Sequence, residues 1–176
     1  IRFFNIPLQG TISPHLANLS FLSELVLSNN SLTGHIPDCL GQLHRLTLID
    51  LKGNFLSGSI PFTIFNMSFL LELYAGVNNL SGPLPSNNSF IMLPRLRIFS
   101  LSYNHFTGDS VTSFARCWDL QILSLSSNQF TGTILAEIGL LSKLTILYLG
   151  DNQLTGTIPA SLGNLTKLSK LDLSKN

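Results

Sequence analysis

The sequence predicts one solenoid of the α/β class, with a parallel β-sheet on its concave face and short helical turns on its convex face. Three observations predict this fold. A unit of about 24 residues repeats along the chain, each unit carries an asparagine and a glycine at fixed positions, and apolar residues alternate before each asparagine. The 176 residues are 44% hydrophobic and 11% charged, which suits a single domain with one buried core.

Each repeat is expected to begin with a short strand. Leu25 and Leu27 alternate with more polar neighbours, as do Leu147 and Leu149, which is the period of a strand with one buried face. Because the chain returns to the same point after every circuit, successive strands run in the same direction. They should therefore pair in parallel, about 4.8 Å apart.

One asparagine per repeat follows this strand, and we expect it to hold neighbouring coils together. A coil that turns sharply inside a stack leaves backbone donors and acceptors facing inward, and a carboxamide can satisfy both. Successive members lie 24 residues apart, except for an interval of 26 between Asn78 and Asn104. The predicted ladder consists of Asn30, Asn54, Asn78, Asn104, Asn128, Asn152 and Asn176.

A glycine stands four residues after each of the first six asparagines, where it predicts a turn with positive φ or a very close backbone approach. These glycines are Gly34, Gly58, Gly82, Gly108, Gly132 and Gly156. On the return path, leucines fall three residues apart, as in Leu40, Leu43 and Leu46. This spacing predicts short 3₁₀ or irregular helical turns on the outer wall.

The whole chain is expected to be one repeat array. A partial first repeat covers 1–18, full repeats begin near residues 19, 43, 67, 93, 117 and 141, and a partial last repeat covers 165–176. Ile6 occupies the ladder position of the first coil, which is therefore degenerate. The two extra residues predict an outward loop in "PSNNSFIML", and Ser110-Val111 and Ile134-Leu135 predict a weakened second strand, because they replace the usual Ile-Pro pair.

"LSELVLSNNSLTGHIPDCLGQL" and "LTILYLGDNQLTGTIPASLGNL" resemble the plant-type leucine-rich repeat, and the likeness covers essentially the whole chain. The resemblance implies a right-handed superhelical solenoid of the kind found as the extracellular domain of receptor-like kinases and receptor-like proteins. Such arrays need capping segments at both ends. The caps of this family carry cysteine pairs, which are absent here, so we expect the chain to be a fragment, with any kinase domain outside it.

The two cysteines are not expected to form a disulfide. Cys39 and Cys117 lie at least three coils apart, or about 14 Å by strand spacing, whereas a disulfide requires Cα atoms within roughly 7 Å. Cys117 shares the column of Leu43 and Leu141, so we expect it to be a small buried apolar residue. The environment of Cys39 stays open.

The chain also carries six N-glycosylation sequons, which favour an extracellular protein. Asn18, Asn66 and Asn164 share one repeat position on the expected outer flank. The alternative is that these letters are simply those that the family prefers in its convex turns. The candidate acceptors are Asn18, Asn29, Asn66, Asn79, Asn87 and Asn164.

Nothing in the sequence predicts catalysis. The four histidines fall at different repeat positions, and we find no metal-protease, phosphate-loop, hydrolase or dinucleotide motif. Asp50 and Glu72 could approach each other across adjacent strands, but a solvated pair on an open surface is the better interpretation. We therefore expect no enzyme activity, catalytic residue, metal site or cofactor.

Composition also argues against other partners. The formal net charge is +1 and the basic residues are scattered singly, so no stripe is available to bind a nucleic acid. The sequence contains no run of eighteen or more apolar residues, which is the length that a helix needs to span a bilayer. Membrane attachment would come only through segments absent from this chain, at the extracellular face of the plasma membrane, or the protein would lie in the apoplast.

Binding is expected on the concave face, at the positions where the repeat does not dictate the residue. Tyrosines and isolated charges there suit an extended peptide or a protein loop, whereas the serines between them, Ser100 to Ser127, are expected to form a flat stretch that adds little. The alternative is that these solvated positions simply vary. The candidate ligand-binding residues are Glu24, Asp50, Lys52, Glu72, Tyr74, Tyr103, Tyr148 and Asp151.

The resemblance implies two functions from different classes. The first is the ligand-binding ectodomain segment of a receptor-like kinase in immune or developmental signalling, with a leucine-rich repeat co-receptor as a possible second partner. The second is a secreted inhibitor of a cell-wall-degrading enzyme, similar to polygalacturonase-inhibiting proteins. A third option is a fragment without a ligand. Arg95 and Arg97 do not match the arginine pair that holds a peptide carboxylate in some relatives.

Overall fold

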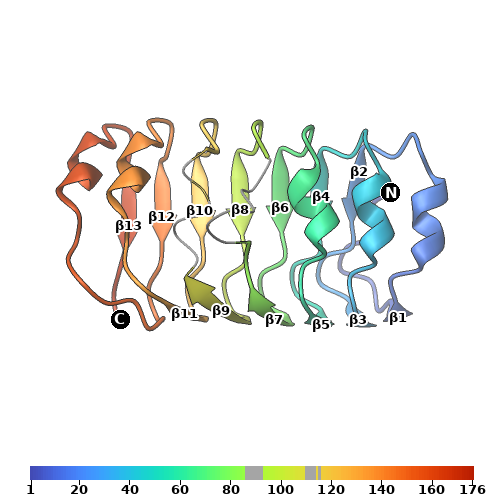
Figure 1. Cartoon of the computed structure of the whole chain (residues 1–176). Helices are drawn as coiled ribbons and strands as arrows, with labels where there is room; N and C mark the ends of the chain where they lie inside the picture. The colour runs from blue at the N-terminus through green and yellow to red at the C-terminus, as the bar shows by residue number, and fades with distance from the viewer. Residues whose placement is uncertain (86–92, 110–113, 115) are drawn as a thin grey trace.

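The computed structural model describes residues 1–85, 93–109, 114 and 116–176 of the chain. The coils stand side by side from the N-terminal end, drawn in blue, to the C-terminal end, drawn in red (Figure 1). One strand per coil builds a continuous sheet, and the short helices lie in front of it in this view. The expected solenoid of parallel strands and short turns is confirmed.

The concave sheet has seven parallel strands in the order β13-β12-β10-β8-β6-β4-β2. The central residue of each strand from β2 to β12 is buried in the core, and its two neighbours are at least partly exposed in most of these strands, as the alternating leucines predict; in β13 the central Leu171 is exposed. The register absorbs the longer repeat without a slip, because Glu72 pairs with Ile98. The strands are Glu24–Val26 (β2), Leu48–Asp50 (β4), Glu72–Tyr74 (β6), Ile98–Ser100 (β8), Ile122–Ser124 (β10), Ile146–Tyr148 (β12) and Lys170–Asp172 (β13).

A second, lateral sheet of six parallel strands follows the ladder asparagines. Among the described residues, the pairing continues beyond the last strand as the isolated bridge between Thr133 and Thr155, so the second strand is weakened next to Ile134-Leu135. The expected loop at "PSNNSFIML" and the pair Ser110-Val111 lie largely outside the described residues. The strands are Gln9–Thr11 (β1), Ser31–Gly34 (β3), Phe55–Gly58 (β5), Asn79–Pro83 (β7), His105–Asp109 (β9) and Gln129–Thr131 (β11).

Among the described residues, five 3₁₀ helices of five residues each return the chain to the next strand. Proline or leucine precedes most of them with an extended backbone, and the residue after each helix donates its N–H to a carbonyl three residues earlier, which closes the turn. They are Pro14–Asn18 (η1), Asp38–Gln42 (η2), Phe62–Asn66 (η3), Ala136–Leu140 (η5) and Ala160–Asn164 (η6).

The core is one continuous column of leucine, isoleucine and phenylalanine side chains between the sheet and the helices. Phe99 and Phe114 pack edge to face with their ring centroids 4.8 Å apart. Cys117 is fully buried in the same column, and this burial raises the pKa of its thiol to about 12. Cys39 is half-buried, and its thiol donates to the carbonyl of Pro14 at 3.2 Å. Neither cysteine forms a disulfide.

The asparagine column repeats one hydrogen-bonding pattern in all seven coils. In Asn54, Nδ2 donates to the carbonyls of Leu27 and Leu51 at 3.0 Å each, and Oδ1 accepts from the Leu32 N–H at 3.1 Å. One side chain thus joins its own turn to the preceding coil. The first four members are buried, Asn128 and Asn152 are half-buried, and Asn176 is exposed.

All seven glycines of the column that begins at Gly10 and ends at Gly156 have positive φ. An added Cβ at Gly34 would lie 3.0 Å from Cγ2 of Thr11 in the preceding coil, so the position is also a close approach. Both physical reasons for the glycine column, positive φ and crowding, therefore apply in this turn.

Candidate ligand-binding site

The parallel register of the concave sheet lines up outward side chains in straight rows. One row holds Ile98, Ile122 and Ile146 on neighbouring strands. The next outward row is polar in the middle and aromatic at its sides, because Ser100 and Ser124 lie between Tyr74 and Tyr148. A ligand lying across the coils would meet several strands in succession.

A groove of about 380 Å³ lies on this face. It extends from the β4 coil to β13, which is five strand spacings, or about 24 Å at ~4.8 Å each. It is lined by Lys52, Gly76, Val77, Ser100, Ser102, Tyr103, Ser124, Ser126, Tyr148 and Asp172.

The groove exists because short side chains lie between large ones. Ser100, Ser102, Ser124 and Ser126, which were expected to form a flat stretch, line the floor of the groove, since a serine reaches much less far from the sheet than Tyr103 or Tyr148. The hydroxyls of Ser102 and Ser124 are 2.7 Å apart and hydrogen-bonded. The Ser126 hydroxyl is buried and finds no hydrogen-bond partner among the described residues.

The two ends of the groove carry opposite charges. Lys52 lies at the end nearer the N-terminus, and Asp172 lies at the other. The Ser174 hydroxyl donates to Oδ1 of Asp172 at 2.7 Å, and the Ser174 N–H donates at 3.0 Å. These bonds hold the pKa of Asp172 below its ordinary value, so this carboxylate stays ionised at neutral pH.

Three of the eight candidate ligand-binding residues, Lys52, Tyr103 and Tyr148, line the groove, and the other five do not. Asp50 is the last residue of β4, two residues before Lys52, and its Oδ1 accepts the Lys52 N–H at 3.1 Å. Asp151 accepts a hydrogen bond from the Ser127 hydroxyl at 3.0 Å. Both carboxylates therefore also fix local backbone or side-chain positions.

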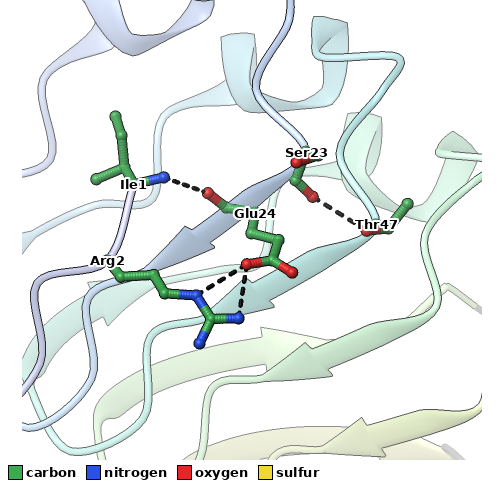
Figure 2. Close-up of polar contacts among 5 residues, drawn as sticks. All are labelled: Ile1, Arg2, Ser23, Glu24 and Thr47. Carbon is green, nitrogen blue, oxygen red and sulfur yellow. Dashed lines mark hydrogen bonds and ion pairs between the residues drawn. The ribbon is translucent and has the colours of Figure 1, made fainter.

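Glu24 is held by the N-terminal segment (Figure 2). The Arg2 guanidinium lies 2.7 Å from the Glu24 carboxylate, and the amino group of Ile1 donates to the Glu24 carbonyl at 2.9 Å. Both partners remain partly exposed, so this ion pair contributes little to stability. It does engage the carboxylate that the sequence suggested for ligand binding.

Tyr74 and Glu72 form a hydrogen-bonded pair beside the groove. The Tyr74 hydroxyl donates to Oε2 of Glu72 at 3.0 Å. Partial burial, then the hydrogen bond to Glu72, and then the negative charges of Glu72 and Asp50 raise the pKa of Tyr74 well above its ordinary value. The phenol is therefore a neutral donor at any physiological pH.

Sequence reasoning missed Gly76 and Asp172 as parts of the site. A signal was present for Asp172, since it stands four residues before Asn176, the position that Asp50, Tyr74 and Tyr148 hold in their own coils. Gly76 gave no such signal, because a missing side chain is visible only as space in the structure.

The residue before each ladder asparagine has a left-handed backbone in every coil. Its φ lies between 53° and 67° throughout, and Tyr103 and Asp151 owe their positions on the concave face to this turn. The column consists of Asn5, Asn29, Gly53, Val77, Tyr103, Ser127, Asp151 and Lys175.

A second hollow, of about 420 Å³, lies beside η3 and is lined mainly by Phe62, Phe65, Pro83, Leu84 and Pro85. It draws on only two coils and offers few hydrogen-bonding side chains. An extended chain needs contacts from several coils in a row, so the concave groove is the better candidate despite its slightly smaller volume.

Some sequon asparagines lie at the ends of the 3₁₀ helices, and others lie in or next to the turn that follows a concave strand. Asn18, Asn66 and Asn164 are exposed at the ends of η1, η3 and η6. Asn79 is exposed at the start of β7, and Asn87 lies outside the described residues. Asn29 is exposed too, but its Nδ2 donates to Oδ1 of Asn5 at 3.0 Å.

The described residues contain neither a candidate metal site nor a helix that could cross a membrane. No group of three histidine, cysteine, aspartate or glutamate side chains could hold a metal ion in the part of the chain that the structure describes. Within the same residues, no helix has the length and hydropathy that a membrane crossing requires.

The Leucine Rich Repeat family profile matches residues 21–43, 45–67, 95–117, 119–141 and 143–165, which together make up more than half of the chain. Among curated proteins, Receptor-like protein 31 of Arabidopsis thaliana is 44% identical over 52 residues, a stretch that covers 28% of this chain and 6% of that protein.

Solved structures match over nearly the full length. The ectodomain of the Arabidopsis thaliana receptor kinase GASSHO1/SCHENGEN3, in complex with CASPARIAN STRIP INTEGRITY FACTOR 2, is 41% identical with a TM-score of 0.91, over 95% of this chain and 20% of that one. The Arabidopsis receptor kinase HAESA, in complex with the peptide hormone IDA and the co-receptor SERK1, is 35% identical with a TM-score of 0.92, over 98% of this chain and 28% of that one. The chain thus spans only 6% to 28% of the length of these relatives.

Proposed function

The chain belongs to the leucine-rich repeat family, and on this premise we propose that it is an extracellular recognition module whose concave groove binds an extended peptide or a protein loop. The observation that carries the proposal is the groove between Lys52 and Asp172, which crosses successive strands and has tyrosines on both sides of a serine floor. Aromatic anchors beside short polar side chains bury area at low entropic cost.

A receptor ectodomain is the setting that we favour. The similar ectodomains of GASSHO1/SCHENGEN3 and HAESA hold a peptide factor or a peptide hormone, and HAESA also holds a co-receptor. By analogy, this chain would bind its ligand for a plant receptor-like kinase or receptor-like protein, in immune or developmental signalling, and would meet a leucine-rich repeat co-receptor at a second surface. A secreted inhibitor of a wall-degrading enzyme would use the same face for a larger partner.

Glycosylation fits the same proposal. Sugars on Asn18, Asn66 and Asn164 would project from the helical layer, away from the groove. A sugar on Asn29 would replace the hydrogen bond to Asn5 and would project near the concave face, so we propose the three helix-end sites as the preferred acceptors. Site occupancy measured by mass spectrometry on protein from plant cells tests this order.

The test of the groove is capture of extracellular peptides and proteins by the full chain and by two variants. Ser124→Tyr should fill the groove, and the sheet should accept it because Tyr74 and Tyr148 stand in the same row. Ser142→Tyr, at an exposed position outside the groove, is the matched control. The proposal predicts that Ser124→Tyr loses the captured ligand and Ser142→Tyr retains it; equal capture by both would refute it.

A further inference from the structure

Two residues in the left-handed column differ in kind from the others. Asparagine, aspartate and glycine tolerate this backbone well and hold four of its eight positions. Val77, with φ of 57°, is β-branched, and Tyr103, with φ of 61°, is bulky. A β-branched residue in this conformation is a genuine outlier.

The stack of coils imposes this backbone on both residues. The Val77 N–H donates to the Ser102 carbonyl at 2.9 Å, and the Val77 carbonyl accepts from the Asn54 N–H at 3.1 Å. Tyr103 repeats the pattern with Ser126 at 2.9 Å and Asn78 at 3.2 Å. Both residues therefore remain in a strained conformation, since their backbone cannot relax without losing inter-coil hydrogen bonds.

Core packing does not compensate this strain. The Val77 side chain is 47% exposed and the Tyr103 side chain is 63% exposed, and both line the groove in adjacent coils. Strained residues that make no large contribution to the core are concentrated at functional sites.

Gly76 leaves space next to these two side chains. A Cβ on Gly76 would lie 2.9 Å from the carbonyl oxygen of Ser102, so no side chain fits there without a shift of the backbone. The groove is therefore open directly beside Val77 and Tyr103, whose apolar surfaces face water in the absence of a ligand.

We infer that Val77 and Tyr103 form the specificity-determining wall of the groove, and that the ligand is an extended peptide with a bulky apolar side chain that packs against both of them beside Gly76. This rests on the proposed function. At ~3.4 Å per extended residue, the ~24 Å of groove accommodates about seven residues.

The experiment selects random linear seven-residue peptides, displayed on phage, against the full chain. Enriched peptides are then measured against Val77→Asn, Tyr103→Asn and Ser127→Asn. Asparagine suits the left-handed backbone, so Val77→Asn should raise the melting temperature by about 2 to 4 °C. The same change should weaken the peptides about tenfold or more, because the apolar wall is lost.

Ser127→Asn is the matched control, since Ser127 occupies the same position in a later coil and does not line the groove. It should change affinity by less than about twofold. The inference is supported if the enriched peptides share one bulky apolar position and if Val77→Asn raises the melting temperature while it weakens peptide binding. Peptides without such a position, or peptides that bind Val77→Asn as tightly as the original chain, overturn the inference alone. If no peptide is enriched, the inference fails, and the proposed function is decided separately by the capture experiment with Ser124→Tyr and Ser142→Tyr.

Discussion

The side-chain amide of Asn54 donates a hydrogen bond to the backbone carbonyl of Leu27, one coil earlier, at 3.0 Å. The same carboxamide accepts the Leu32 N–H from that coil. The Leu32 N–H thus depends on a side chain of the next coil, whereas the Leu27 carbonyl also accepts from Nδ2 of Asn30 at 2.9 Å. The groove lies across successive coils, so its geometry requires that junctions of this kind hold the coils together.

Asn54→Leu is therefore expected to destabilise the chain by about 1 to 3 kcal/mol, since the buried Leu32 N–H loses its acceptor and the coils lose the hydrogen bonds that Nδ2 donates. Asn128→Leu should fall at the lower end of this range, because Asn128 is half-buried. Asn176→Leu, at an exposed member of the same column, should cost less than about 0.5 kcal/mol, because water can replace the amide. Urea unfolding followed by circular dichroism measures all three, and equal midpoints for Asn54→Leu and the original chain would contradict the ladder.

Gly34→Ala should also destabilise the chain, by about 1 kcal/mol or more, because φ is +77° and the new Cβ would lie 3.0 Å from Thr11. Gly163→Ala is the control. Gly163 has an ordinary φ and open space around its Cβ position, so alanine there should be neutral or stabilise by up to about 1 kcal/mol. Thermal unfolding separates the two, and a neutral Gly34→Ala would show that the turn relaxes easily.

The buried thiol predicts a specific alkaline destabilisation. Burial raises the pKa of Cys117 from an ordinary 9.0 to about 12, so the unfolded chain loses this proton first as the pH rises. The stability that depends on the neutral thiol is complete below pH 9 and is lost between about pH 9 and 12, at up to about 1.4 kcal/mol per pH unit.

Cys117→Val removes this loss. The difference in unfolding free energy between Cys117→Val and the original chain should therefore grow in favour of the variant between pH 8 and pH 10.5, as urea midpoints at both pH values would show. A difference that does not change with pH would mean that water reaches the thiol in the folded state.

The fold could be predicted from the sequence because each inter-coil contact repeats with the chain. Asn30 and Asn54 fix the length of the coil, and Leu25 and Leu27 fix the direction of the strand and its buried face. The extra two residues before Asn104 did not disturb this logic, because the register resumes at Ile98.

The site could be predicted only in part. The strand period shows which side chains face outward, and so it identified Lys52, Tyr103 and Tyr148. The hollow itself depends on how far side chains in neighbouring coils extend from the sheet and on the space at Gly76. The sequence of a single repeat reveals neither. The left-handed column was also missed, although Asn29, Gly53 and Asp151 are residues that favour that backbone.

The partners of the charged candidates could not be derived from the repeat either. Arg2 reaches Glu24 because the N-terminal segment lies along β2, next to Val26 (Figure 2). That contact is made by the degenerate first coil, where the repeat gives no guide to side-chain positions.

The central claim is that the ligand lies in the concave groove, and the most direct measurement is the affinity of a captured ligand for Tyr148→Ala and for Phe62→Ala by titration calorimetry. Tyr148 lines the groove, whereas Phe62 lines the second hollow beside η3. We predict that Tyr148→Ala folds with unchanged stability and binds about tenfold more weakly or worse, while Phe62→Ala binds like the original chain. Loss of affinity in Phe62→Ala with full affinity in Tyr148→Ala would place the ligand on the convex side and contradict the account.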